Sequence, residues 1–242
     1  MAVPDPTSFL YRVNSGAWEA VVGTDGFTDT SAPTYGGSGD DEYAAYDGTD
    51  DFTEVDTPPD MTGFGFANDF SIAIRFRAPS GTLDEEQYLL GMGIASGGAS
   101  KVYISMNTDG TITCRVDAGS ENRQLSTVSS YNDGADHVVA FTHDSTLDNL
   151  NIYIDDAADG NSSTSGLSDD TSELEHMVIG AEPVGTIGDA GFWSDRIYWI
   201  AGWDDTFLST SERAELDDSS WPFDIPSAGG SSILPLLNAY YG

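Results

Sequence analysis

The most constraining feature of this sequence is an alternation of apolar and polar side chains that recurs along the chain. Apolar residues occupy every second position within residues 70–76, 102–106, 112–116 and 150–154. Because successive side chains of a β-strand point to opposite faces, each segment is expected to be a strand with one face on a core. The 3.6-residue repeat of a helix is almost absent. The pattern therefore predicts a chain built mainly of half-buried β-strands.

Turn-forming residues separate these strands. Residues 107–110 (Asn-Thr-Asp-Gly) lie between two of them and predict a hairpin. Residues 132–134 (Asn-Asp-Gly) and 159–161 (Asp-Gly-Asn) mark two further turns. Many short strands joined by polar turns, with no helices between them, are typical of an antiparallel sandwich or barrel.

One short helix is expected near the C-terminus. Ser209 and Glu212 have the spacing of a capping box, in which the two side chains bind each other's backbone N–H groups. The helix is expected to run to about Asp218, because Trp221-Pro222 follows shortly afterwards. The expected fold is therefore all-β with one C-terminal helix.

The composition divides the chain into three segments. Residues 1–41 hold an N-terminal strand pattern and an acidic loop rich in Gly, Ser and Thr, residues 42–218 hold the sandwich, and residues 219–242 hold a Gly/Ser spacer and an apolar tail. A flexible spacer allows the segment after it to extend to a neighbouring subunit, and an exposed apolar patch usually marks a contact surface. We expect the tail to make an assembly contact, although an edge strand beside the N-terminal strand is an alternative. The contact residues would be Leu234, Leu236, Leu237, Tyr240 and Tyr241.

Acidic residues dominate the charge. Against 41 Asp and Glu stand 8 Lys and Arg, and the formal net charge is −33. Nucleic acid and anionic membranes are excluded as partners, because both are bound through Lys and Arg, and no stretch approaches the ~20 apolar residues that span a bilayer. At about 1 M salt the Debye length falls to roughly 3 Å, which screens self-repulsion. The charge indicates adaptation to strong brine, with a calcium-rich acidic extracellular protein as the alternative.

Several segments, read in order, resemble the laminin-G-like, concanavalin A-like lectin family. The opening Tyr-Asp-Gly-Thr-Asp-Asp-Phe of residues 46–52 is similar to a strand and turn of that family. The further similar segments are residues 69–72, 136–142, 150–155, 178–180, 192–200 and 208–216. The resemblance covers residues 42–218 and implies an antiparallel two-sheet jelly-roll sandwich. It also implies a lectin-like function, although the fold hosts glucanases as well.

We expect no catalytic residues. A retaining glycosidase needs two carboxyl groups about 5–5.5 Å apart, and the nearest match to the glucanase pattern is Glu54 and Asp56, with a third carboxylate, Asp60, only after two prolines that end the strand. His137 and His143 flank a strand without any nucleophile motif such as G-x-S-x-G. The chain is therefore expected to be no enzyme.

Calcium is a candidate ligand of one loop. Asp155, Asp159 and Asn161 supply the oxygen atoms that calcium prefers, if residues 155–161 form a bent loop. The alternative is a hairpin loop that carries ordinary acidic residues. No other cofactor is indicated.

Aromatic residues are crowded into one segment and could stack on sugar rings. The candidates are Trp193, Trp199 and Trp203. If this segment is one continuous strand, Trp193 and Trp199 share a face. Packing in the core is the alternative for these large side chains.

The combined features favour a non-enzymatic virion structural protein with a lectin-like jelly roll. The N-terminus has no basic region followed by an apolar run, so no conventional signal peptide is expected, and a virion protein needs none. Such a protein would decorate a head or tail, or form a fibre or turret, of a tailed virus from a halophilic host. It would assemble in the host cytoplasm, contact itself and other virion proteins, and bind a host glycan from the virion surface. A cellular carbohydrate-binding lectin module and a diverged glycoside hydrolase stay open as alternatives.

Overall fold

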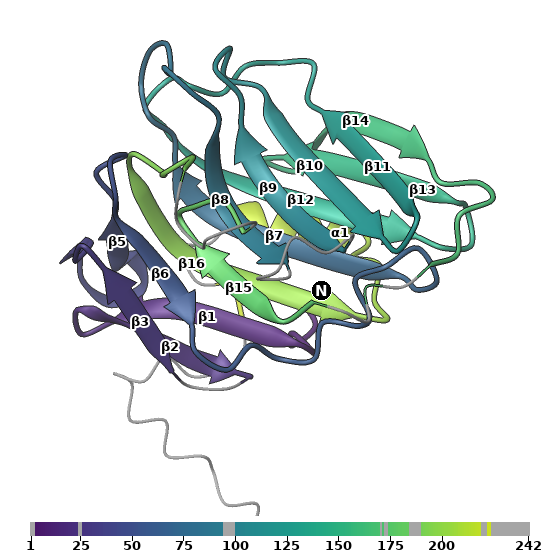
Figure 1. Ribbon diagram of the computed structural model, residues 1–242, viewed down its shortest axis with the longest axis horizontal. Helices are drawn as coiled ribbons and strands as arrows, with labels where there is room; N and C mark the ends of the chain where they lie inside the picture. The colour runs from purple at the N-terminus through teal and green to yellow at the C-terminus, as the bar shows by residue number, and fades with distance from the viewer. Residues whose placement is uncertain are drawn as a thin grey trace, which may run out of the picture.

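The computed structural model describes residues 3–23, 26–93, 100–169, 171, 174–183, 190–218 and 222–223. Within these residues, sixteen strands form two antiparallel sheets that pack face to face (Figure 1). The all-β sandwich expected from the alternating pattern is therefore confirmed, as is the hairpin at residues 107–110, where Gly110 N–H donates to the Asn107 carbonyl at 2.9 Å.

The first sheet has nine strands. Seven follow one path, namely β14 (Ala157–Ser163), β13 (Asn149–Ile154), β12 (Asp136–Asp144), β7 (Phe70–Arg77), β16 (Arg196–Asp204), β1 (Phe9–Asn14) and β2 (Ala17–Val22). Beside the start of β16 lies β5 (Tyr43–Ala45), which pairs in turn with β4 (Thr34–Gly36). A 3-10 turn, η1 (Gly39–Asp41), connects β4 to β5.

The second sheet has seven strands. Their order is β11 (Glu121–Ser126), β10 (Ile112–Ala118), β9 (Lys101–Met106), β8 (Gln87–Gly93), β15 (His176–Ile179), β6 (Phe52–Val55) and β3 (Phe27–Thr30). The main core lies between the two sheets and holds the apolar side of the predicted strands. It includes Phe70, Ile72, Ile74 and Phe76 of β7.

A second apolar layer covers the outer face of the first sheet. Helix α1 (Thr210–Asp218) begins as predicted, since Ser209 N–H and Oγ both donate to Glu212 Oε2 at 2.7 Å. Leu216 of α1 and Leu208 before it pack on this face together with Val3 and Phe223. Because apolar residues cover both of its faces, β16 is buried along almost its whole length.

The N-terminal segment contributes strands to both sheets. β1 lies between β16 and β2, whereas β3 forms an end of the second sheet. Both edges of β1 are therefore occupied, which leaves no place for the C-terminal tail to pair beside it. The predicted assembly residues lie outside the described residues; they are Leu234, Leu236, Leu237, Tyr240 and Tyr241.

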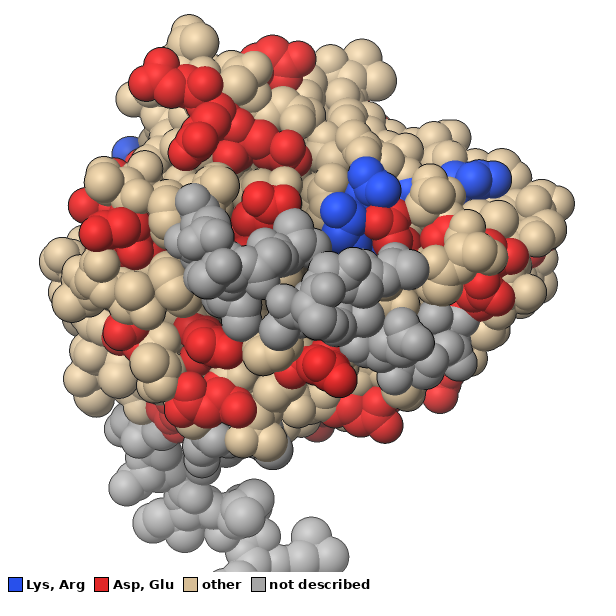
Figure 2. Space-filling view, in the orientation of Figure 1, with Lys and Arg blue, Asp and Glu red and all other residues tan. Residues whose placement is uncertain are grey.

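Acidic side chains are spread over the visible face of the molecule, whereas Lys and Arg are visible at only a few places on it (Figure 2). In the described part of the chain, no helix has the length and apolar character needed to cross a bilayer.

Candidate functional site

Three loops meet at one end of the sandwich and enclose a groove. They are the β5–β6 turn, the β7–β8 loop and the segment that leads into β16. They meet because β7 ends where β16 begins, with Phe76 paired to Ile197, and β8 starts close by. The groove has a volume of about 560 Å³. Its lining residues are Gly48, Pro79, Ser80, Thr82, Leu83, Asp84, Glu85, Gln87, Ser194 and Asp195.

A glycine allows two of these loops to touch. Gly48 has φ +75°, a backbone conformation that residues with a Cβ rarely adopt. A Cβ placed on Gly48 would lie only 2.6 Å from the Cβ of Ser194. The β5–β6 turn can therefore pack against the segment before β16 only because residue 48 is a glycine.

The floor of the groove offers both a hydrogen-bond donor and an acceptor. Gln87 is only 7% exposed, and its Oε1 accepts a hydrogen bond from Ser194 Oγ at 2.8 Å. Its amide nitrogen has no hydrogen-bond partner among the described residues. Burial raises the pKa of the neighbouring Asp195, an effect that Arg77 and Arg196 counter only in part. A buried amide and a carboxylate that line the same groove can donate to and accept from ligand hydroxyl groups.

The β7–β8 wall of the groove is held by the β11–β12 loop. Gly81 N–H donates to the Asn132 carbonyl at 3.0 Å, and Asn132 Nδ2 donates to the Gly81 carbonyl at 2.5 Å. The next residue, Asp133, forms an isolated β-bridge with Ser80. These contacts give the wall a fixed position.

His137 secures Asp133 in turn. Its Nε2 lies 3.2 Å from Asp133 Oδ1, and its Nδ1 lies 2.7 Å from Asp155 Oδ2. Burial lowers the pKa of His137, but the hydrogen bonds and charges of Asp155 and Asp133 outweigh it and raise the pKa above its usual value. Both ring nitrogens can donate only in the protonated imidazole, so the two carboxylates favour that form.

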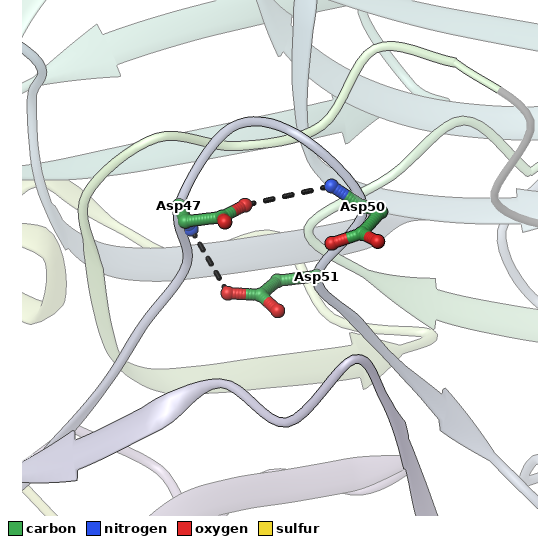
Figure 3. Close-up of side chains that lie close together, drawn as sticks. All are labelled: Asp47, Asp50 and Asp51. Atoms are coloured by element: carbon green, nitrogen blue, oxygen red, sulfur yellow. Dashed lines mark hydrogen bonds between the residues drawn. The ribbon is translucent and has the colours of Figure 1, made fainter.

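The β5–β6 turn also carries an acidic cluster, consisting of Asp47, Asp50 and Asp51 (Figure 3). One oxygen atom from each carboxylate lies within 4.8 Å of the others. Asp51 Oδ2 accepts from Asp47 N–H at 3.1 Å, and Asp47 Oδ1 accepts from Thr49 N–H at 2.8 Å. Burial raises the pKa of Asp51, and the charge of Asp47 adds to the effect. Such a cluster of oxygen atoms has the chemistry that calcium prefers.

The structure does not form the predicted calcium loop. Asp155 and Asp156 have φ of +50° and +60°, which makes a tight two-residue turn, and strand β14 begins at Ala157. The prediction of a bent loop at residues 155–161 is therefore wrong. Its acidic and amide residues do not converge, because Asn161 pairs with Asn151 within the strands.

Both predicted calcium carboxylates already bind protein groups. Asp155 Oδ1 accepts from Val138 N–H at 2.9 Å, besides its contact with His137. Asp159 Oδ2 accepts from Tyr131 Oη at 2.5 Å. The backbone N–H groups of residues 128 and 129 donate to the same carboxylate at 3.1 and 3.2 Å. These carboxylates fix loops of the sandwich.

The three predicted glycan-binding tryptophans are all buried. Trp193, Trp199 and Trp203 expose 1% of their surface or less. Trp193 packs edge-on against Phe76 in the main core, and Phe223 covers the other two on the outer face of the first sheet. The prediction that they bind glycan is wrong, because none of these rings is free to stack on a sugar.

Nor do Trp193 and Trp199 share a face. β16 begins only at Arg196, after Trp193, and its pairing with β7 shifts between Ile197 and Trp199. A strict alternation cannot be extended through such an irregularity. Trp193 therefore points into the main core, whereas Trp199 lies in the outer apolar layer.

The carboxylates compared with a glucanase pattern contact separate groups. Glu54 Oε1 lies 3.3 Å from His176 Nδ1, whereas Asp56 Oδ1 accepts from Thr28 Oγ1 at 2.7 Å. Asp60 Oδ1 accepts from both the N–H and the hydroxyl of Thr62. Each carboxylate therefore has a structural contact of its own.

The other histidine of the predicted strand pair has a structural contact too. His143 is 1% exposed, and its two ring nitrogens lie 2.7 Å from the Asn68 carbonyl and 3.0 Å from Thr164 Oγ1. The carbonyl can only accept a hydrogen bond, so Nδ1 donates to it. Both ring nitrogens are occupied by protein groups, which leaves neither to activate a nucleophile.

A family model described as the concanavalin A-like lectin/glucanases superfamily matches residues 47–197, which is more than half of the chain. The chain belongs to this superfamily. The match begins in the acidic turn and ends in β16, so it includes all three loops of the groove. No curated protein sequence matches the chain.

Solved structures of similar fold include two toxin binding domains and a carbohydrate-binding module. The binding domain of botulinum neurotoxin serotype G superposes with a TM-score of 0.66 at 14% identity, covering 86% of this chain and 50% of that one. The binding domain of Paraclostridial mosquitocidal protein 1 gives 0.66 and 14%, covering 86% and 51%. This chain thus spans about half the length of both. The Ruminococcus gnavus IT-sialidase CBM40, bound to α2,3 sialyllactose, gives 0.51 and 15%, covering 61% and 82%.

Proposed function

We propose that this chain is a non-catalytic carbohydrate-binding domain and that the groove between its three loops holds the sugar. The observation that carries the proposal is the buried Gln87 amide, which lines the groove together with Asp195 and whose nitrogen has no hydrogen-bond partner among the described residues. Sugar hydroxyls donate and accept hydrogen bonds at once, and such a pair of groups satisfies both roles. The hydroxyl groups of Ser80 and Thr82 on the rim add further partners.

The similar structures support this proposal. Two of them are called binding domains and a third is a carbohydrate-binding module in complex with sialyllactose. The superfamily also includes glucanases, which keeps a diverged glycoside hydrolase as the alternative. The separate contacts of Glu54 and Asp56 favour binding over hydrolysis.

A glycan array, followed by calorimetry with the best ligand, tests the proposal. Gln87→Ala is expected to weaken binding at least about tenfold, because a buried hydrogen bond is lost. Ser194→Ala, which removes the hydroxyl that orients Gln87, is expected to weaken it less. Gln124→Ala is the matched control, since Gln124 lies exposed on β11 in the second sheet. Equal affinity of all three variants, or release of reducing sugars by the wild type, would contradict the proposal.

We further propose that this domain works on the surface of a virion in high salt, where it contacts copies of itself and other virion proteins and adheres to a host glycan. The net charge of −33 supports a high-salt setting, and the apolar C-terminal tail supports an assembly contact. A cellular lectin module is the alternative. Mass spectrometry of purified virus particles from the source culture separates the two, because only a virion protein remains with the particles after gradient purification.

A further inference from the structure

We propose that the groove selects glycans that carry a protonated amine and rejects glycans that carry a carboxylate. This inference rests on the proposed glycan binding and adds the chemical class of the ligand. It starts from the charges that line the groove. Asp84, Glu85 and Asp195 line it, whereas no Lys or Arg does so among the described residues.

Two arginines, Arg77 and Arg196, lie near the groove residue Asp195 and also contact other groups. Arg77 Nε lies 4.0 Å from Asp195 Oδ2, but its Nη1 lies 3.4 Å from Asp136 Oδ1, so one cation serves two carboxylates. Arg196 lies with its guanidinium 4.2 Å from the ring centre of Tyr43. Both cations therefore contact other groups of the protein, and neither residue lines the groove.

The acidic turn adds negative charge on another side. Gly48 lines the groove, and the turn that contains it carries Asp47, Asp50 and Asp51. Burial raises the pKa of Asp51, as does the charge of Asp47. The pKa of Asp195 is raised as well, first by its burial. Three carboxylates line the groove and three more lie in the acidic turn, so a ligand carboxylate would add to a concentration of negative charge.

A protonated amine reverses the sign of this interaction. It carries three N–H donors and no acceptor, which matches a rim of carboxylates and hydroxyl groups. The Gln87 amide remains available to donate to a ring hydroxyl. In a glycan with free amino groups, the ammonium groups can therefore pair with the carboxylates and the hydroxyl groups with the Gln87 amide. Its N-acetylated form loses the charge interaction and keeps the hydroxyl contacts.

Calorimetry with three oligosaccharides tests this selectivity. The probes are a chitosan tetramer with free amines, the N-acetylated chitin tetramer and α2,3 sialyllactose, measured at the lowest KCl concentration at which circular dichroism shows a folded protein. We expect the chitosan tetramer to bind at least about fivefold more tightly than the chitin tetramer and sialyllactose not to bind. The preference should shrink toward molar KCl, because salt screens it.

Charge-neutralising variants locate the effect. Asp84→Asn with Glu85→Gln should reduce the preference for the amine, because it removes two of the three carboxylates that line the groove. The control with the same change in net charge is Asp5→Asn with Asp205→Asn, two exposed residues near the far end of β16. It should keep the preference. Equal binding of the two tetramers, or binding of sialyllactose, would overturn the selectivity while glycan binding stands. If no glycan on the array or in the calorimeter binds, the proposed function itself fails.

Discussion

The contact between the β5–β6 turn and Ser194 gives a prediction with a worked magnitude. In Gly48→Ala the new Cβ must adopt φ +75° and would lie 2.6 Å from the Cβ of Ser194. The left-handed backbone costs about 1 kcal/mol, and forcing extra atoms into a packed contact costs a further 1–3 kcal/mol or so. We therefore expect a loss of about 2–4 kcal/mol in the free energy of unfolding.

Gly166→Ala separates the two contributions. Gly166 has φ +84°, but a Cβ there meets no atom within 4 Å. This control should lose only about 1 kcal/mol. Denaturant titrations of both variants give the difference, and only Gly48→Ala should also weaken glycan binding, because Ser194 must move. If both variants lose the same free energy, the turn does not pack on Ser194 and the described groove is wrong.

Three further predictions concern charge and the chain end. The melting temperature should rise between about 0.1 and 3 M KCl as salt screens the self-repulsion; a flat or falling curve in calorimetric scans would contradict adaptation to brine. Because the folded-state pKa of His137 is raised above 6.5, its stabilising contribution is fully present below about pH 6.5 and is lost as the pH rises through the folded-state pKa. Unfolding titrations should show this loss in the wild type and in His176→Gln but not in His137→Gln, and equal pH profiles would count against the His137 contacts. Deletion of residues 231–242 should leave a folded monomer that no longer assembles, as judged by circular dichroism and light scattering; an unfolded truncation would place the tail in the core.

Local patterns were sufficient to predict much of the fold. Alternation identified the strands around Phe70 and Ile152 because a half-buried strand exposes every second side chain. The capping box at Ser209 identified the start of α1 because its contacts are local in sequence. The place of β1 between β16 and β2 could not be predicted from local patterns, since β1 pairs Phe9 with Gly202 across most of the chain.

The predicted sites failed where local irregularities decide the direction of a side chain. The register of β16 shifts before Trp199, so an alternating pattern assigns this side chain to the wrong face. A tight turn at Asp155 replaces the bent loop that was expected for calcium. The groove carries no motif, because Gly48, Gln87 and Ser194 come from three distant segments. The acidic turn at residues 47–51 had a visible signal, three aspartates within five residues, but only the fold brings their carboxylates together.

The central claim is that the groove beside Gln87 holds a glycan. A crystal structure of the wild-type domain with the tightest oligosaccharide from the array tests it most directly. We predict a sugar ring between the β7–β8 loop and Ser194, with one hydroxyl within hydrogen-bond distance of Gln87 Nε2 and Asp195. An oligosaccharide bound elsewhere, for example in the cavity of about 440 Å³ lined by Ser126, Asn151 and Asn161, with the groove free of sugar, would contradict it.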